Sequence, residues 1–345
     1  MTRQIHVGNV AVGGGAPVSI QSMLNTRTTD VEGSLAQIEE LRAAGCQIVR
    51  LAVPNQAAAA GFAEIAKRSS LPLVADIHFD YRLAIAAAEG GAAKIRINPG
   101  NIGGETHVRA LAQVCRERGI PVRIGVNGGS LDKKLLQKYG HPTAEALVES
   151  AFSHIALLEK YGFYDICVSM KSSSVPVTIE AYRLMHEKSD YPLHLGVTEA
   201  GTLRMGTIKS AMGIGGLLCM GIGDTIRVSL TDSPVREVEV ARDILAAAGL
   251  RKDGPEIISC PTCGRTSIDL IQLAQQVEKA LAGCTKPITV AVMGCVVNGP
   301  GEAREADVGV AGGNGKGVLF AKGKPVATMP YDQLLNAMLD YIDQL

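Results

Sequence analysis

Short apolar runs alternate with helical patterns through the first 250 residues of the chain. Eight runs are expected to be strands: Val18–Met23, Ile48–Pro54, Leu73–His78, Lys94–Pro99, Val122–Asn127, Asp165–Lys171, Leu193–Glu199 and Thr225–Thr231. Helical stretches such as Asp30–Ala44, Arg82–Glu89, Thr143–Tyr161 and Pro234–Ala248 separate them. Eight β-then-α units in about 250 residues match the size of a closed (β/α)8 TIM barrel. An open doubly wound sheet also alternates, but eight even repeats favour closure.

Basic residues occur inside five of the predicted strands, where apolar residues are expected. They are Arg50, Arg96, Arg123, Lys171 and Arg227. Because side chains alternate between the two faces of a strand, Asn98, Asn127, Ser229 and the pair Asp76 and His78 are expected on inward faces as well. Apolar helices cover the outside of a barrel, so these polar positions are expected to face its interior.

Acidic residues in or near the strands are fewer than these cations. Internal ion pairs with Asp76, Asp165 and Glu199 are the structural alternative, but three acids cannot neutralise five cations. A buried cation without a partner is costly, so we expect a bound anion with more than one charge, and a diphosphate fits best. The glycine-rich turns N-P-G-N-I-G-G and N-G-G-S after the fourth and fifth strands can bring backbone N–H groups to phosphate oxygens.

The composition fits a folded protein of two domains. The chain has 345 residues, of which 46% are hydrophobic, and its formal net charge is +0. A neutral chain argues against binding to nucleic acid or a membrane surface through bulk charge. The N-terminus lacks the features of a secretory signal and no apolar run approaches membrane-spanning length, so a cytoplasmic protein is expected.

A second pattern begins after R-K-D-G-P-E, residues 251–256, which is expected to be a linker between a barrel domain at 1–250 and a smaller α/β domain at 257–345. Strands are expected at Ile257–Ser259, Ile288–Met293 and Asp307–Ala311, with a strand pair around Val318–Thr328. Helices are expected at Ile268–Ala282 and from Tyr331 onward.

The small domain carries C-P-T-C-G-R from Cys260 and M-G-C-V-V-N-G-P-G-E, which contains Cys295 and ends at Glu302. Three thiols and a carboxylate suit an iron–sulfur cluster with one open iron. A zinc ribbon with Cys284 as fourth ligand, or a metal-free redox C-x-x-C, are the alternatives. Cys46, Cys115, Cys167 and Cys219 lie in apolar segments and are expected in the core.

Motifs along essentially the whole chain resemble the 4-hydroxy-3-methylbut-2-enyl diphosphate synthase family. They are the two cysteine motifs above with Q-S-M, L-V-A-D-I-H-F-D-Y-R, R-I-N-P-G-N-I-G, R-I-G-V-N-G-G-S-L, L-H-L-G-V-T-E-A-G and G-I-G-D-T-I-R-V-S-L. Their order is that of the two-domain form of the family. Cys284 lies outside the family's pattern and is taken as structural.

The resemblance implies a [4Fe-4S] cluster held by Cys260, Cys263, Cys295 and Glu302. It also implies an iron–sulfur oxidoreductase that opens the ring of 2-C-methyl-D-erythritol 2,4-cyclodiphosphate, using two electrons from ferredoxin or flavodoxin, in the methylerythritol phosphate route of isoprenoid biosynthesis. The barrel cations, with Asp76, Asn98, Asn127 and Ser229, would bind substrate. Glu199 and His78 would donate or orient protons, and Asn298 would contact substrate near the open iron.

Two other functions remain open from the residues alone. One is a zinc-stabilised barrel that binds a phosphorylated ligand, and the other is a barrel aldolase that uses Lys171 as a Schiff-base lysine. For the assembly, the last barrel helix should return the chain to the face opposite the barrel's mouth. We therefore expect a homodimer with composite active sites, in which each small domain serves the partner's barrel.

Overall fold

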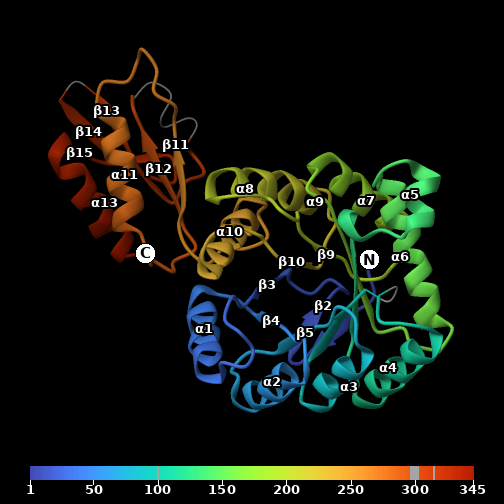
Figure 1. Ribbon diagram of the computed structural model, residues 1–345. Helices are drawn as coiled ribbons and strands as arrows, with labels where there is room; N and C mark the ends of the chain where they lie inside the picture. The colour runs from blue at the N-terminus through green and yellow to red at the C-terminus, as the bar shows by residue number, and fades with distance from the viewer. Residues whose placement is uncertain (99–100, 296–302, 314) are drawn as a thin grey trace. The chain divides into compact units, whose positions relative to one another are not determined.

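The computed structural model describes residues 1–98, 101–295, 303–313 and 315–345 (Figure 1). The chain divides into two compact units, Met1–Leu250 and Arg251–Leu345. Each has a hydrophobic core of its own.

The first unit is built on eight parallel strands, as predicted. They are β3 (Ser19–Met23), β4 (Ile48–Ala52), β5 (Leu73–Asp76), β6 (Lys94–Ile97), β7 (Val122–Asn127), β8 (Ile166–Lys171), β9 (His194–Leu195) and β10 (Thr225–Ile226). Their order is β8-β7-β6-β5-β4-β3-β10-β9, and a parallel bridge between Val168 and Leu193 joins the two ends. The sheet is therefore a barrel rather than an open doubly wound sheet.

The last two barrel strands are shorter than the predicted Leu193–Glu199 and Thr225–Thr231. Their later residues form loop hydrogen bonds in place of ladder bonds: Thr198 N–H donates to Ser172 O at 3.3 Å, and Thr231 N–H donates to Gly201 O at 2.9 Å. These two loops shape one side of the barrel's mouth.

Helices surround the barrel (Figure 1). They are α1 (Val31–Ala44), α2 (Gln56–Arg68), α3 (Tyr81–Glu89), α4 (Glu105–Arg118), α5 (Lys133–Tyr139), α6 (Ala144–Glu159), α7 (Val175–Lys188), α8 (Leu203–Ser210), η2 (Ala211–Gly215), α9 (Gly216–Cys219) and α10 (Pro234–Ala247), with a short turn η1 (Gly128–Ser130) after β7. Several of these helices begin at N-cap residues: the side chains of Asp30, Asn55 and Thr143 accept hydrogen bonds from backbone N–H groups of the first turn.

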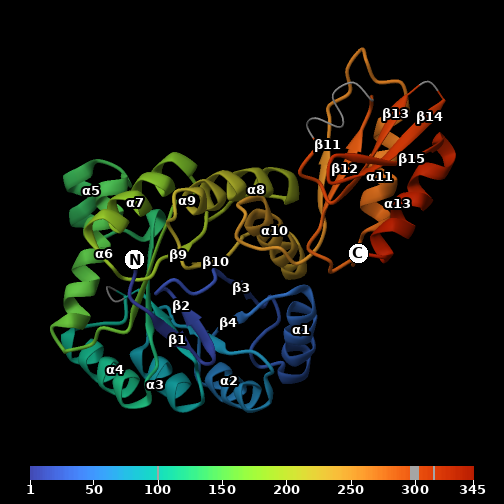
Figure 2. The same cartoon turned by 180° about the vertical axis from the view of Figure 1, so that it is seen from behind.

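A short hairpin of β1 (Ile5–Val7) and β2 (Val10–Val12) packs against the amino-terminal ends of barrel strands (Figure 2). Ile5, Val7 and Val12 form one apolar cluster with Ile48, Val74 and Cys167, which lie at or near the start of β4, β5 and β8. No strand is predicted here from the sequence, because three-residue runs are too short to show alternation. The hairpin covers the barrel at the end away from its mouth.

The described residues of the second unit form a five-stranded sheet with helices α11 and α13 on one face. The strands β11 (Glu256–Ser259), β12 (Thr289–Met293) and β13 (Val308–Gly313) are parallel, and β14 (Lys316–Ala321) and β15 (Lys324–Pro330) continue the sheet antiparallel. Strand β11 starts at Glu256, one residue earlier than predicted. Helices α11 (Leu270–Ala280) and α13 (Leu334–Asp343), the latter preceded by η3 (Tyr331–Gln333), pack on the sheet through Leu273, Val277 and Met338.

Four cysteines of the first unit were expected in the core. Cys46, Cys115 and Cys167 are buried as predicted, but Cys219 is exposed because it ends α9 at the surface, so its assignment to the core was wrong.

Across the described ranges, no helix combines the length and the apolar character that crossing a membrane requires.

Candidate functional site

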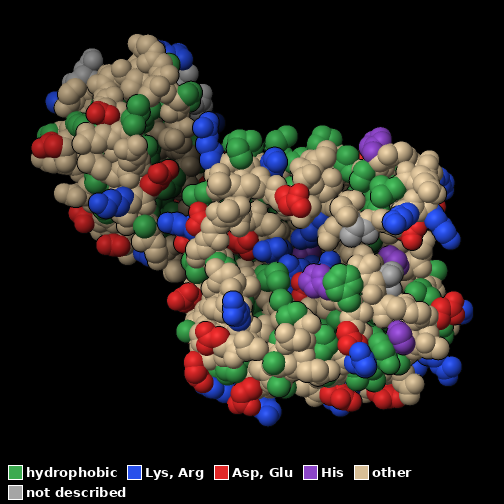
Figure 3. All heavy atoms as spheres, viewed as in Figure 1, with side chains coloured by type: hydrophobic (Ala, Val, Ile, Leu, Met, Phe, Trp, Pro, Cys, Tyr) green, Lys and Arg blue, Asp and Glu red, His purple; other side chains and the backbone are tan. Residues whose placement is uncertain are grey.

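The barrel interior gathers the five cations that the sequence singles out. Arg50, Arg96, Arg123 and Lys171 are buried, and the side chain of Arg227 is 18% exposed. Strand register places Arg96 directly beside Arg123 and brings Lys171 next to Asn127. Figure 3 shows Lys and Arg side chains collected in a hollow of this unit, as an anion site requires.

Asp76 is the carboxylate at the centre of this group. Its two oxygens lie 3.0 Å from Arg96 Nη1 and 3.7 Å from Arg50 Nε. Burial opposes ionisation of Asp76, but Arg50 and Arg96 outweigh it and lower the pKa of the carboxyl group. Asp76 is therefore ionised at neutral pH, and it offsets one positive charge.

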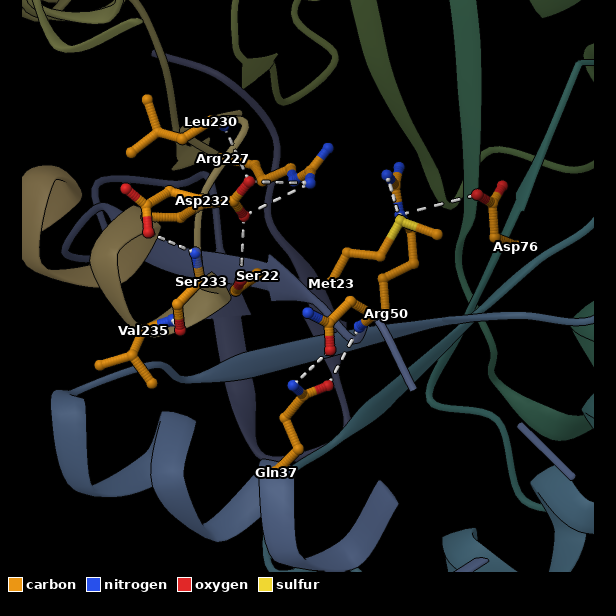
Figure 4. Close-up of polar contacts among 12 residues, drawn as sticks. Ser22, Met23, Gln37, Arg50, Asp76, Arg227, Leu230, Asp232, Ser233 and Val235 are labelled. Atoms are coloured by element: carbon orange, nitrogen blue, oxygen red, sulfur yellow. Dashed lines mark hydrogen bonds and ion pairs between the residues drawn. The ribbon is translucent and has the colours of Figure 1, made fainter. Parts of the chain in front are cut away.

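Arg50 has an unusual second partner. Its Nε and Nη2 atoms lie 3.1 Å and 2.8 Å from Met23 Sδ (Figure 4). A thioether is a weak acceptor without charge, so it orients the guanidinium but leaves its charge available. Burial lowers the pKa of Arg50 well below its ordinary value, with further lowering from Arg123 and Arg227.

Arg227 is paired with Glu237, which the sequence analysis missed. Arg227 Nη2 donates to both carboxylate oxygens of Glu237, at 3.2 Å and 3.3 Å. Glu237 comes from helix α10 and is 4% exposed. An acidic residue on the apolar face of the predicted helix Pro234–Ala248 was the signal that could have revealed it.

The two other acids proposed as internal partners are not buried among the cations. Glu199 and Asp165 are exposed, and neither forms an ion pair with these cations in the described part of the chain. Asp165 precedes β8 and therefore lies at the amino-terminal end of the barrel, away from the mouth. The internal ion-pair alternative thus fails for these two residues.

Several donors in the interior have no hydrogen-bond partner among the described residues. They are Arg96 Nε, Arg123 Nε and Nη1, and Arg227 Nε. No ion pair reaches Arg123 or Lys171 in the same ranges. Burial, with Arg96 adding to it, lowers the pKa of Arg123 to about 10; burial and Arg123 lower the pKa of Lys171 well below its ordinary value. Within the described residues, Arg123 and Lys171 therefore lack a paired negative charge that would stabilise them.

Two more polar residues lie deeper, and the sequence analysis missed both. Lys94 and His194 are fully buried, and neither Lys94 Nζ nor the two ring nitrogens of His194 has a partner in the described ranges. Burial lowers the pKa of Lys94 to about 8 and that of His194 well below its ordinary value. Lys94 is two residues before Arg96 on the same strand face, so alternation could have predicted its position.

Two glycines, Gly125 in β7 and Gly196 directly after β9, leave space for two of the cations. A β carbon on Gly125 would lie 2.6 Å from Arg96 Nε, and one on Gly196 would lie 2.4 Å from Lys171 Nζ. Neither glycine has a positive φ, so space rather than backbone conformation explains them.

A cavity of about 210 Å³ opens beside Arg227. Its lining consists of Thr198, Glu199, Ala200, Gly201, Arg227, Ser229, Leu230 and Thr231. Glu199 has a φ of 51°, a strained value for a residue with a side chain. One cavity is therefore lined by a proposed proton donor, Glu199, and by two proposed substrate ligands, Arg227 and Ser229.

The remaining barrel candidates lie near the carboxyl ends of their strands. Asn98 follows β6 and is buried, and Asn127 is the last residue of β7. His78 is exposed beside Phe79, with 6.1 Å between the ring centroids. The mouth of the barrel thus carries amide and imidazole groups around the cations.

The thiols of the second unit follow neighbouring strands. Cys260 comes directly after β11 and Cys295 comes two residues after β12, and Ser259 pairs with Val292 in the ladder. Gly294 N–H donates to Cys260 Sγ at 3.1 Å. Cys263 is exposed, and hydrogen bonds from the backbone and side chain of Arg265 lower the pKa of its thiol. Sulfur atoms that accept N–H donors suit a thiolate-bound metal centre.

The described residues give no completed metal centre. No group of three or more His, Cys, Asp or Glu side chains able to hold a metal ion occurs in ranges 1–98, 101–295, 303–313 and 315–345. The candidates Asn298 and Glu302 lie outside the described residues. Cys284 is half-buried and packs against the core of the second unit, which agrees with a structural role.

The fold defines a (β/α)8-barrel protein with a cation-lined interior and an appended α/β unit that carries cysteines. The chain belongs to the GcpE family: the GcpE TIM-barrel domain matches residues 2–242, and the GcpE protein C-terminal domain matches residues 256–344.

Relatives match over the full length. The chain is 59% identical to a protein of Caldanaerobacter subterraneus subsp. tengcongensis named 4-hydroxy-3-methylbut-2-en-1-yl diphosphate synthase (flavodoxin), covering 100% of this chain and 97% of that protein. It is 58% identical to a protein of Clostridium perfringens with the same name, covering 100% and 99%. A type I 3-dehydroquinate dehydratase from Clostridium difficile shares the barrel fold, with a TM-score of 0.51, 15% identity and coverage of 72% and 97%.

Proposed function

We propose that the protein converts 2-C-methyl-D-erythritol 2,4-cyclodiphosphate into 4-hydroxy-3-methylbut-2-enyl diphosphate. The cyclic substrate, with two ionised phosphoryl oxygens, takes up two electrons and one proton; the ring C–O bond breaks, and one oxygen leaves as water. The product then carries one more negative charge than the substrate. The observation that carries this proposal is the excess of buried cations over carboxylates in the barrel.

The barrel residues would bind the diphosphate. Arg96, Arg123 and Arg227 have buried donors without partners among the residues that the structure describes, which suits charge-assisted hydrogen bonds to phosphoryl oxygens. Arg50, Lys171, Asn98, Asn127 and Ser229 complete the proposed set, and Asp76 orients Arg50 and Arg96 within it. The excess positive charge favours the more negative product side of the ring opening.

Glu199 and His78 are the proposed proton donors or proton-orienting groups. Glu199 lines the cavity together with Arg227 and Ser229, and its strained backbone is typical of functional positions. His78 lies at the exposed rim, where it can exchange protons with solvent.

A [4Fe-4S] cluster is the proposed cofactor. Cys260, Cys263 and Cys295 would hold it, with Glu302 as an oxygen ligand and Asn298 beside the substrate. When bound, such a cluster supplies the electrons one at a time and offers an open iron to an oxygen atom. The N–H donors of Gly294 and Arg265 toward Cys260 and Cys263 support thiolate ligation at these positions.

We further propose flavodoxin or ferredoxin as the electron donor, and a homodimer as the working assembly. The names of the relatives state flavodoxin. Met205, Ile208 and Met212, which follow one another along α8 and η2, are 49%, 44% and 57% exposed, and such an apolar stripe suits burial against a second copy.

The test is anaerobic turnover of the cyclodiphosphate with reduced flavodoxin and, separately, with reduced methyl viologen. Product formation with two electrons per molecule, together with iron and sulfide in the protein, is the expected result. A colourless zinc-containing protein without turnover would instead support the zinc-stabilised barrel. Trapping of Lys171 by borohydride in the presence of a carbonyl substrate would support the aldolase.

A further inference from the structure

Glu237 makes hydrogen bonds through both of its carboxylate oxygens. Oε1 accepts from Arg227 Nη2 at 3.2 Å and from Leu230 N–H at 3.0 Å. Oε2 accepts from Arg227 Nη2 at 3.3 Å and from Ser22 Oγ at 3.2 Å. Figure 4 shows these contacts converging from Ser22, Arg227 and Leu230. One buried carboxylate on helix α10 therefore connects β3, the extension of β10 and the loop that follows it.

Glu237 does not line the 210 Å³ cavity, but its partners Arg227 and Leu230 do. The next residue, Thr231, donates its N–H to Gly201 O and so joins the two walls of the cavity. The Leu230 side chain lies against Gly206 of α8, where a β carbon would come within 2.4 Å of Leu230 Cδ2. The hydrogen bonds of Glu237 thus continue into the structure that shapes the cavity.

The pairing also directs the arginine. Glu237 holds Nη2 of Arg227, while the buried Nε of the same guanidinium has no partner among the described residues. An arginine that is already held in one rotamer loses less conformational freedom when it binds an anion.

We propose that Glu237 is a positioning residue of the anion site, which holds Arg227 and the loop at Leu230 in the arrangement that binds a phosphoryl group. This inference rests on the proposed function. It adds a residue outside the cavity that acts through Arg227.

Electrostatics and positioning predict opposite results for Glu237→Gln. The substitution removes a negative charge beside an anion site, so a role limited to charge offset predicts tighter anion binding. Positioning predicts weaker binding, because a neutral amide holds the guanidinium poorly and presents one oxygen in place of two.

The experiment measures binding of inorganic pyrophosphate to the full-length, cluster-loaded protein by calorimetry. We expect Glu237→Gln to raise Kd about ten-fold, and to raise KM for substrate with little change in kcat. Glu239→Gln is the matched control, since Glu239 lies on the same helix but pairs with Arg236 at the surface, at 2.7 Å. An unchanged or lower Kd for Glu237→Gln would overturn the inference.

A double-mutant cycle separates positioning from a general structural effect. If Glu237 acts through Arg227, adding Glu237→Gln to Arg227→Ala should change Kd little, whereas an additive loss would contradict the inference. Should Glu237→Gln not fold, Glu237→Asp replaces it, because the shorter side chain keeps the charge but cannot reach both Arg227 and Leu230; an unchanged Kd would again contradict the inference. Wild-type protein that binds neither pyrophosphate nor substrate would instead refute the proposed function.

Discussion

The guanidinium of Arg96 lies in the space that a side chain at Gly125 would fill. A β carbon on Gly125 would be 2.6 Å from Arg96 Nε and 2.8 Å from Nη2. The two residues belong to neighbouring strands, β6 and β7, and the close approach lets Arg96 reach Asp76 at 3.0 Å while remaining beside Arg123. A glycine on the barrel wall thus determines where a buried charge can lie.

Gly125→Ala should therefore weaken anion binding by displacing Arg96. We expect Kd for pyrophosphate to rise roughly ten-fold or more, the loss of one charge-assisted contact, with the visible absorption of the cluster unchanged. Gly216→Ala in α9 is the control, because its β carbon would find Ile179 Cδ1 at 3.9 Å, an ordinary contact. Equal effects of the two substitutions would show that Arg96 is not involved.

Arg123→Met should separate stability from binding. Arg123 is a buried cation with no ion pair in the described part of the chain. Removing it should raise the melting temperature of the ligand-free protein, because the cost of desolvating the charge disappears. Pyrophosphate binding should weaken by about 2 kcal/mol, or roughly thirty-fold in Kd. Thermal melting with and without pyrophosphate measures both, and loss of folding in the variant would support the structural ion-pair interpretation.

Much of this site follows from strand alternation, and the part that does not follow depends on tertiary packing. Arg50, Arg96 and Arg123 could be placed inside the barrel from the sequence, because apolar helices cover the outer face of the strands and polar side chains must therefore face the interior. Lys94 obeys the same rule and was overlooked. Glu237 lies on the apolar face of a helix, which indicates that it is buried, but no periodicity in the sequence indicates that its partner is Arg227.

For the thiols, the sequence is more informative than the described structure. Their spacing in the sequence suggested a metal centre directly, whereas the described residues place Cys260 and Cys295 after adjacent strands without a completed ligand group. The pairing of β11 with β12 brings the ends of these two strands together, and the spacing of the cysteines in the sequence does not reveal that adjacency.

Lys94→Met should make the protein more stable near pH 7, and less so at higher pH. Burial lowers the pKa of Lys94 from 10.5 to about 8, with Arg123 and Arg50 adding to the shift and Cys167 opposing it. Between these two pH values the unfolded chain binds more protons than the folded one, so wild-type stability rises with pH and the cost of Lys94, about 3 kcal/mol, is relieved.

The melting temperature of Lys94→Met should thus exceed that of wild type by several degrees at pH 7, and by much less at pH 10. Lys279→Met, an exposed position on α11, serves as the control. A difference between Lys94→Met and wild type that does not depend on pH would show that Lys94 has the same pKa in the folded and the unfolded chain, and would contradict this prediction.

Cys263→Ser should abolish the cluster and the activity together, because it removes a thiolate that the iron needs. Iron and sulfide analysis of anaerobically purified protein provides the measurement. Cys284→Ser is the matched control, since Cys284 is half-buried against the core of the second unit and the variant should retain full iron content. Full iron content in Cys263→Ser would remove Cys263 from the ligand set.

The proposed composite site predicts complementation between a chain without a cluster and a chain that binds substrate weakly. Arg242 Nη1 of α10 contacts Ala44 O at the end of α1, at 3.4 Å, so α10 returns the chain toward the amino-terminal side of the barrel, whereas the cavity lies at the carboxyl ends of the strands. The six residues Arg251–Glu256 span at most about 20 Å when extended. So short a linker favours a composite site in which the cysteine unit of one chain completes the barrel site of the partner chain. In a mixed dimer of Cys263→Ser and Arg123→Met chains, one of the two sites would combine an intact barrel with an intact cysteine unit. Each mixed dimer should therefore have about half the activity of a wild-type dimer, at a substrate concentration too low to saturate Arg123→Met. Each variant mixed with itself is the control. Mixed dimers that form but stay inactive would place both halves of the site in one chain.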